Sequence, residues 1–138
     1  MKYIIILLFL PFLTLAQNSR EERYEKIQTA KIGLITEKLD LSTEQAPQFW
    51  SVYNEYQSKK FDLRRNIKRA LDDANAASAN DEKIIAAHRQ VLGYRKKEIE
   101  LEEEYMAKIL KTITPRQFAE LKRTEQSFNK KLLERLQK

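Results

Sequence analysis

The side chains best suited to chemistry lie in one short part of the sequence, residues 50–69. Two of its aromatics and four of its cations lie off the apolar stripe: Trp50, Phe61, Arg64, Arg65, Lys68 and Arg69. A helix that turns about 100° per residue brings them to one side, with Arg69 at its edge. Aromatics hold apolar segments, and cations attract acidic ones. We therefore predict that this side binds a client or partner protein.

A second set of cations recurs every seven residues near the C-terminus, at Arg116, Arg123 and Lys130. These residues lie opposite the apolar stripe of their predicted helix, and we expect them to assist binding. Other interpretations stay open. Trp50 also has the size to pack on the preceding helix or on a dimer partner, and both sets of cations are also compatible with plain solvation.

The residue inventory argues against an enzyme. The chain has no cysteine, and His88 is its only histidine. His88 falls on an apolar stripe, where we expect it to pack in the core. No Gly-rich phosphate loop or Ser/His/Asp spacing is found. The glutamates between Glu98 and Glu104 point to several sides of one helix, so we expect a solvated face in which Glu104 pairs with Lys108. No cofactor and no metal site is predicted.

The N-terminus resembles a secretory signal peptide, residues 1–16. Lys2 provides a positive start, residues 4–13 are apolar, and Ala16 offers a small residue for cleavage. A bilayer span needs ~20 apolar residues, so this run is too short, although an uncleaved anchor stays an alternative. We expect a periplasmic protein without stable membrane insertion after cleavage. The formal charge of +6 suits acidic partners, and export argues against nucleic acid.

The remaining residues, 17–138, predict one all-α domain. Gly33, Gly93, Pro47 and Pro115 are its only helix breakers, and apolar residues recur at helical spacing. We expect helices from about Ser19 to 38, from the first motif below to 71, from 81 to 112 and from the second motif to 138, with a polar loop at 72–80.

The expected core follows from the apolar stripes of these helices. The second helix has a clear stripe of Phe49, Val52, Tyr53, Tyr56, Leu63, Ile67, Ala70 and Leu71. The third has two candidate stripes, which implies two neighbours. The first comprises Ile84, His88, Val91, Leu92, Ile99, Met106, Ile109 and Leu110, and the second comprises Tyr94, Leu101 and Tyr105. Ile32 is expected on the apolar side of the first helix.

Two similar motifs mark the starts of the second and fourth helices. They are Leu41-Ser42-Thr43-Glu44-Gln45 and Ile113-Thr114-Pro115-Arg116-Gln117. In each, the hydroxyl caps a free backbone N–H, and the glutamine three residues later reaches back to the N–H of the capping residue. We interpret both motifs as architectural.

These motifs, the leader and the small basic helical domain together resemble the Spy/CpxP family, whose motif is Leu-Thr-x-x-Gln. Ser42 and Ile113 depart from that pattern but keep the capping chemistry. Residues 38–56 are also similar to a branch of small secreted proteins labelled sensors of ECF-type sigma factors. The resemblance implies a bent antiparallel cradle of four helices, usually a homodimer.

The resemblance also implies two functions. One is an ATP-independent holdase chaperone for unfolded or misfolded envelope proteins under envelope stress. The alternative is a regulator that binds a single envelope signalling protein, such as a sensor kinase or a component of a sigma/anti-sigma pathway. Metal response, known in relatives, fits poorly with one histidine and no cysteine.

Overall fold

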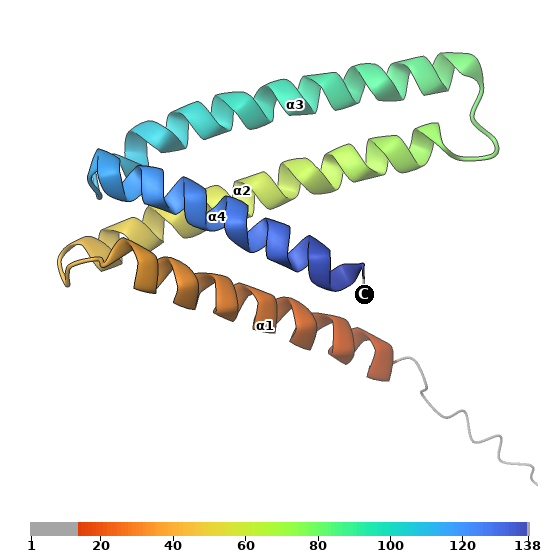
Figure 1. The fold of residues 1–138 in the computed structure, drawn as a ribbon. Coiled ribbons are helices and arrows are strands. Elements are labelled where there is room, and N and C mark those ends of the chain that lie inside the picture. The colour runs from red at the N-terminus through yellow and green to blue at the C-terminus, as the bar shows by residue number, and fades with distance from the viewer. Residues whose placement is uncertain (1–13, 138) are drawn as a thin grey trace, which may run out of the picture. The chain divides into compact units, whose positions relative to one another are not determined.

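The protein is all-helical over residues 14–137, which are the residues that the computed structural model describes (Figure 1). Its elements are α1 (Thr14–Leu39), α2 (Gln45–Ala74), α3 (Asp81–Ile109) and α4 (Pro115–Leu136). The prediction of an all-α fold with four helices is confirmed. Within the described range, no helix is long and apolar enough to cross a membrane. Residues 1–13 of the predicted signal peptide lie outside that range.

The chain divides into two compact units. The first contains α1 up to Lys38 together with residues 123–138, and the second contains residues 39–122. In the first unit, Lys31 of α1 forms a largely buried ion pair with Glu125 of α4, 3.5 Å apart. The second unit consists of the α2–α3 hairpin and the first two turns of α4.

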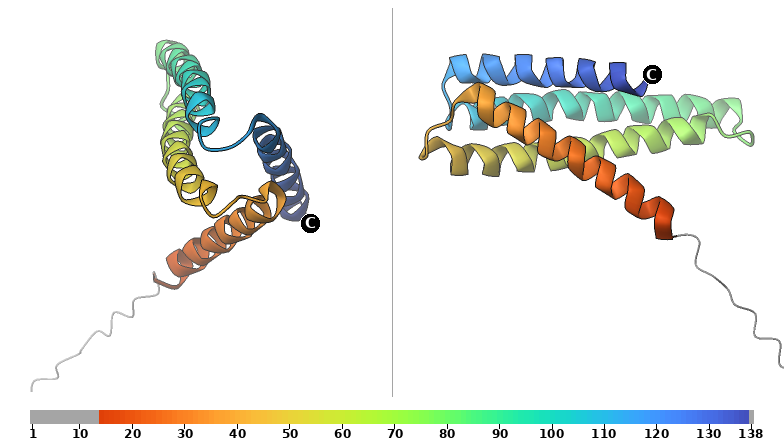
Figure 2. Two further views of the ribbon diagram at one scale, coloured as in Figure 1. Left: turned by 90° about the vertical axis from the view of Figure 1, so that its left-hand side faces the viewer. Right: turned by 60° about the horizontal axis from the view of Figure 1, so that its bottom comes forward.

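The α2–α3 hairpin is the best-packed part of the second unit. The two helices run antiparallel and side by side in every view (Figures 1 and 2), and residues 75–80 connect them. Asn80 caps α3, because its side-chain oxygen accepts a hydrogen bond from the Lys83 N–H at 3.0 Å. Near the C-terminal end of α3, away from the loop, Tyr56 stacks on Tyr105 with ring centroids 5.4 Å apart.

The seam of α3 against α2 has heptad spacing. Covered positions recur three and four residues apart along it: Ile84, Ala87, Val91, Tyr94, Glu98, Leu101, Tyr105 and Lys108. Glu102 and Ile109, each next to one of these positions, are covered as well. This spacing is that of left-handed helix pairing. Of the two predicted stripes, the one containing Tyr94, Leu101 and Tyr105 therefore faces α2. The predicted stripe of α2 is confirmed, since all its members are buried or half-buried.

Several sequence predictions about the core and the helix ends are wrong. Leu92, Ile99 and Met106 are 65%, 68% and 45% exposed, and Ile32 of α1 is also exposed. His88 is exposed as well, although it directly follows the buried seam residue Ala87. The heptad seam explains this result for α3, because it takes Ile84 and Val91 from the first predicted stripe together with the second stripe and leaves Leu92, Ile99 and Met106 exposed.

Three predicted helix ends also differ. α2 continues to Ala74, three residues beyond its predicted end at 71. The helix predicted to start at Ser19 begins at Thr14, and no glycine or proline between them interrupts it. At the other end of the hairpin, α3 stops at Ile109 rather than near Thr112. There the Ile109 carbonyl accepts both the N–H and the hydroxyl of Thr112, each at 2.8 Å. The same carbonyl also accepts the Ile113 N–H at 3.1 Å, and the chain leaves the helix in a turn.

Both motifs form the predicted capping boxes. Ser42 Oγ accepts the Gln45 N–H, and Gln45 Oε1 accepts the Ser42 N–H, both at 3.1 Å. The second motif repeats this arrangement between Thr114 and Gln117, at 3.2 and 2.9 Å. The helix starts are therefore fixed as the sequence predicts.

The two glutamines also bind each other, which the capping pattern does not predict. Gln45 Nε2 donates to Gln117 Oε1 at 2.9 Å, and Gln117 Nε2 donates to Gln45 Oε1 at 3.1 Å. Gln117 Nε2 also donates to the Leu39 carbonyl at 3.1 Å. Asp40 follows Leu39 with a φ of 45°, a left-handed conformation that ends α1 and that short polar residues tolerate. One amide pair thus connects the end of α1 with the starts of α2 and α4.

We expect the amide pair to show strong coupling in a double-mutant cycle of Gln45→Ala and Gln117→Ala. Each single variant loses its capping acceptor and leaves the other amide without its partner, which costs about 1–3 kcal/mol. The double variant should be less destabilised than the sum by about 1 kcal/mol. Urea denaturation followed by circular dichroism measures this.

Ser42→Ala combined with Thr114→Ala is the matched control, since it removes the capping hydroxyls and keeps both amides. These two changes should be additive. Additive losses in the glutamine cycle would show that the amides act only as independent caps.

Candidate functional site

The predicted binding residues on α2 form a cationic strip that is exposed but charge-paired. We define the α2 strip as Phe61, Arg64, Arg65, Lys68 and Arg69. Phe61 is 51% exposed, and the Arg65 guanidinium lies 5.7 Å from the centre of its ring. All four cations are exposed, Arg69 included. The structure therefore brings an accessible aromatic ring and a row of cations together on α2.

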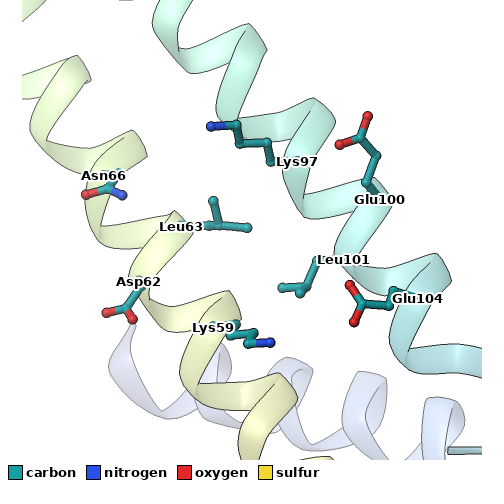
Figure 3. A pocket seen from close by; sticks show the side chains of 8 residues that line it. All are labelled: Lys59, Asp62, Leu63, Asn66, Lys97, Glu100, Leu101 and Glu104. Atoms are coloured by element: carbon teal, nitrogen blue, oxygen red, sulfur yellow. The ribbon is translucent and has the colours of Figure 1, made fainter. Parts of the chain in front are cut away.

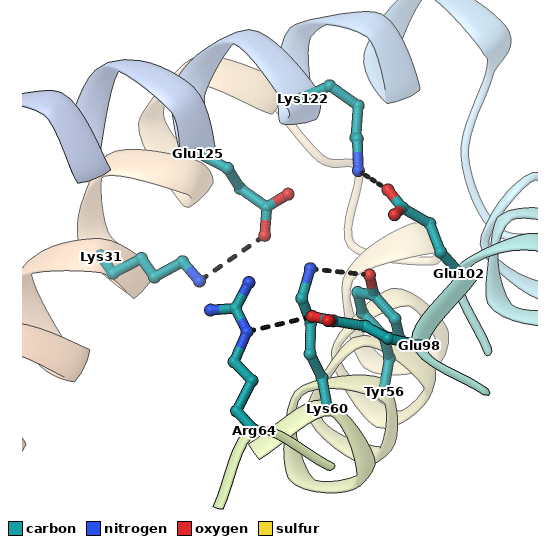
Figure 4. A network of polar contacts seen from close by, with 8 residues as sticks. All are labelled: Lys31, Tyr56, Lys60, Arg64, Glu98, Glu102, Lys122 and Glu125. Atoms are coloured by element: carbon teal, nitrogen blue, oxygen red, sulfur yellow. Dashed lines mark hydrogen bonds and ion pairs between the residues drawn. The ribbon is translucent and has the colours of Figure 1, made fainter. Parts of the chain in front are cut away.

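Carboxylates of the same chain contact three of these cations. Arg65 binds Asp62 at 2.8 Å, and Lys68 binds Asp72 at 2.6 Å. Arg64 crosses to α3, where its Nε donates to Glu98 at 3.0 Å (Figure 4). The local positive charge is thus lower than the sequence suggested. The pairs of Arg65 and Lys68 are exposed on both sides, and exposed ion pairs contribute about 0–1 kcal/mol, so an incoming acidic group can replace Asp62 and Asp72 at little cost.

Trp50 does not belong to this strip. It lies eleven residues before Phe61, or about 16 Å along the helix axis. Its ring packs edge-on against Phe49 and Tyr53, with centroids 5.0 and 5.5 Å away, and it is half-buried. These contacts match the interpretation of Trp50 as a packing residue, although it packs within its own helix.

The α4 cations fall into different units. Arg116 is exposed and belongs to the same unit as the α2 strip, whereas Arg123 and Lys130 are exposed and belong to the other unit. Lys122, which the sequence analysis did not select, donates a short hydrogen bond to Glu102 of α3 (Figure 4). The start of α4 is thereby held against α3 by a charge contact.

The acidic run of α3 is only partly the solvated face that the sequence predicts. The Glu104–Lys108 pair is confirmed, with 2.6 Å between its atoms. Glu98 and Glu102, however, bind Arg64 and Lys122 on other helices. In the described part of the chain, no cluster of three or more histidine and carboxylate side chains is arranged to hold a metal ion.

An aromatic and ionic cluster that sequence analysis missed surrounds Tyr105. The Nζ atoms of Lys59 and Lys108 lie 5.2 and 4.4 Å from its ring centre. Its hydroxyl is buried and makes no aligned hydrogen bond within the described residues. Glu55 and Lys59 lie beside it. The polar contact of each with the Tyr105 hydroxyl is the main reason that the pKa of Glu55 is lowered and that of Lys59 is raised. The ion pair between Glu55 and Lys59, 2.9 Å long, shifts both pKa values in the same directions. The cluster holds α2 and α3 together near the C-terminal end of α3.

An open groove runs beside this cluster on the other side of the α2–α3 seam from Arg64 (Figure 3). Leu63 and Leu101 form its apolar part. Charged and polar residues from both helices surround them: Lys59, Asp62, Asn66, Lys97, Glu100 and Glu104. Because both charge signs alternate along it, the groove favours neither acidic nor basic ligands. The α2 strip stays the better candidate for selective binding.

No protein-family model, curated protein or solved structure matches the chain. The resemblance to the Spy/CpxP family, the curved cradle and the periplasmic location therefore stay predictions that rest on the residues quoted above.

The Lys122–Glu102 contact predicts a pH dependence of stability. The hydrogen bond from Lys122 lowers the pKa of Glu102 below its ordinary value of 4.5. The folded state therefore holds this proton less tightly than the unfolded state. The stabilisation is complete above the unfolded-state pKa and is lost as the pH falls through the folded-state pKa. Because both side chains are about half exposed, we expect a contribution below about 1 kcal/mol.

Thermal melts of wild type and Glu102→Gln test this expectation. Between neutral and acidic pH, the melting temperature of the variant should fall less than that of wild type. Glu134→Gln, a change at an exposed position of α4, is the control and should follow wild type. An acid-induced loss in Glu102→Gln as large as in wild type would contradict the assignment.

Proposed function

We propose that the protein is a non-enzymatic, ATP-independent holdase whose α2 strip binds exposed aromatic and acidic segments of unfolded envelope proteins. The observation that carries the proposal is the exposed ring of Phe61 beside Arg65, in a row of cations of which Arg65 and Lys68 have exposed carboxylate partners. A single exposed apolar residue is ordinary on a protein surface, so it is the combination of the ring with the row of cations that supports binding.

The proposed binding is weak and exchangeable, because a client competes with contacts already present. An acidic side chain of the client replaces Asp62 or Asp72 as the partner of Arg65 or Lys68. The exchange conserves the number of ion pairs, so its net free energy is small. An apolar side chain of the client adds burial against Phe61. Such contacts let the client leave without nucleotide hydrolysis.

The first test compares two triple variants of equal charge in an aggregation assay with a denatured client and no nucleotide. Arg64→Ser/Arg65→Ser/Lys68→Ser removes three cations of the α2 strip and should lose most of the protection. Lys83→Ser/Lys111→Ser/Lys131→Ser removes three exposed cations elsewhere and should keep it. Equal loss in both variants would show that only net charge matters, and no protection by wild type would exclude a holdase.

The second test separates the aromatic from the ionic contribution. Phe61→Ser should weaken protection at every salt concentration. Raising ionic strength shortens the screening length from about 10 Å at 0.1 M to about 3 Å at 1 M. Salt should therefore weaken the protection given by wild type but leave that of the α2 triple variant nearly unchanged.

Affinity capture from envelope extract tests the regulatory alternative. If it yields one stoichiometric partner that both α2 variants fail to bind, the regulatory function replaces the holdase.

A further inference from the structure

The side of α3 that faces away from α2 carries a row of exposed apolar residues. We define the α3 outer row as Ile85, Leu92, Ile99 and Met106, whose exposed fractions are 55%, 65%, 68% and 45%. Its members are seven residues apart, so they follow one side of the helix. Single exposed apolar residues are ordinary on protein surfaces, whereas a regular row along one helix indicates an interaction surface.

The charges on α3 divide this row into a basic and an acidic part. Residues 83–97 carry five lysines and arginines and no carboxylate, whereas five of the seven residues from 98 to 104 are glutamates. Asp81 and Glu82, in the first turn of the helix, bound the basic part on its other side. Leu92 therefore lies in the basic part of the row, and Met106 lies in the acidic part.

Leu92 has cations on both sides. Residues three or four positions apart are neighbours on a helix surface, which places Arg89 and Lys96 on one side of Leu92 and Arg95 on the other. All three cations are exposed. Within the described residues, neither arginine forms an ion pair, and the contact of Lys96 with Glu100 is 3.9 Å and exposed. These cations are therefore available to an external anion, unlike most of those in the α2 strip.

We propose that residues 85–96 of α3 lie on the surface of anionic phospholipid membranes. Leu92 and Ile85 enter the boundary between headgroups and acyl chains, and the cations beside them contact the lipid phosphates. A planar lipid surface supplies negative charge on both sides of an inserted side chain at once. An acidic protein would need carboxylates placed on both sides of an apolar pocket. In this arrangement the helix lies in the plane of the membrane and does not cross it.

The acidic part of the row limits the contact. Glu102 and Glu103 precede Met106 by four and three residues, and Glu103 is exposed. Anionic headgroups repel these carboxylates, so Met106 stays outside the membrane. The contact is therefore confined to about three turns of α3. These turns are at the end of the hairpin next to its loop (Figure 1).

This inference does not rest on the proposed holdase activity, because the α3 outer row and the α2 strip share no residue. Wild type should float with vesicles of equal parts phosphatidylglycerol and phosphatidylcholine, and not with vesicles of phosphatidylcholine alone. Leu92→Ser should lower the vesicle partition coefficient roughly tenfold, because less apolar surface enters the membrane. Met106→Ser, in the acidic part of the same row, is the matched control and should bind as wild type does.

Two results of this experiment would overturn the proposal. The first is that wild type does not bind the anionic vesicles. The second is an equal loss in Leu92→Ser and Met106→Ser, which would leave the row to a protein that covers its whole length. Circular dichroism of each variant establishes that it is folded.

A pair of triple variants with equal charge tests the contribution of the cations. The α3 triple variant should lower the partition coefficient roughly a hundredfold; it is Arg89→Ser/Arg95→Ser/Lys96→Ser. Its control should bind as wild type does, and it removes three exposed cations elsewhere: Lys111→Ser/Lys131→Ser/Arg135→Ser. The α2 triple variant should also keep vesicle binding although it loses client protection, which separates this proposal from the holdase. Equal losses in the α3 triple variant and its control, or a loss only in the α2 triple variant, would overturn the assignment to α3.

A fluorophore at a single cysteine locates the contact directly, because the chain has no cysteine of its own. An environment-sensitive dye on Leu92→Cys should shift its emission to shorter wavelength when anionic vesicles are added. The same dye on Met106→Cys should show no shift. A shift at both positions, or at neither, would overturn the proposal that residues 85–96 form the membrane contact.

Discussion

The reciprocal amide pair of Gln45 and Gln117 is the constraint on which the second unit depends. Each glutamine oxygen accepts two hydrogen bonds, one from its own capping residue and one from the other glutamine. Each amide nitrogen donates to the opposite oxygen, and Gln117 also satisfies the Leu39 carbonyl. Because half-buried amides are costly to leave unpaired, neither helix start is complete without the other. The α2–α3 hairpin is closed at one end by this pair and at the other by its own loop.

Local patterns made part of this structure predictable. The capping boxes, the stripe of α2 and the Glu104–Lys108 pair all depend on residues three or four positions apart, and all are present. The amide pair was not predictable, because the caps already accounted for both glutamines and the partner is 72 residues away. On α3 the sequence offers two apolar rows of the same heptad spacing. The structure, in which Tyr105 stacks on Tyr56, covers Tyr94, Leu101 and Tyr105 and leaves Leu92, Ile99 and Met106 exposed.

In the candidate site, too, only contacts between residues close in the sequence were predictable. The partners of Arg65 and Lys68 lie three and four residues away and could be inferred from spacing, whereas that of Arg64 lies on another helix. The sequence alone therefore overstated the positive charge of the α2 strip. It also placed Trp50 beside Phe61 by angle, although the two are separated by three helical turns. A helical projection gives the direction of a side chain and omits its height along the axis.

The distance in sequence between the two glutamines has a kinetic consequence. The contacts of the α2–α3 hairpin join segments that its short loop connects, so they can form early and without a large loop-closure cost. Gln117 becomes available only after the whole hairpin and the start of α4 have been synthesised. Closure of the amide pair is then a late step, and a chain interrupted before residue 117 would keep the first capping box in solvent, with its glutamine bound to water.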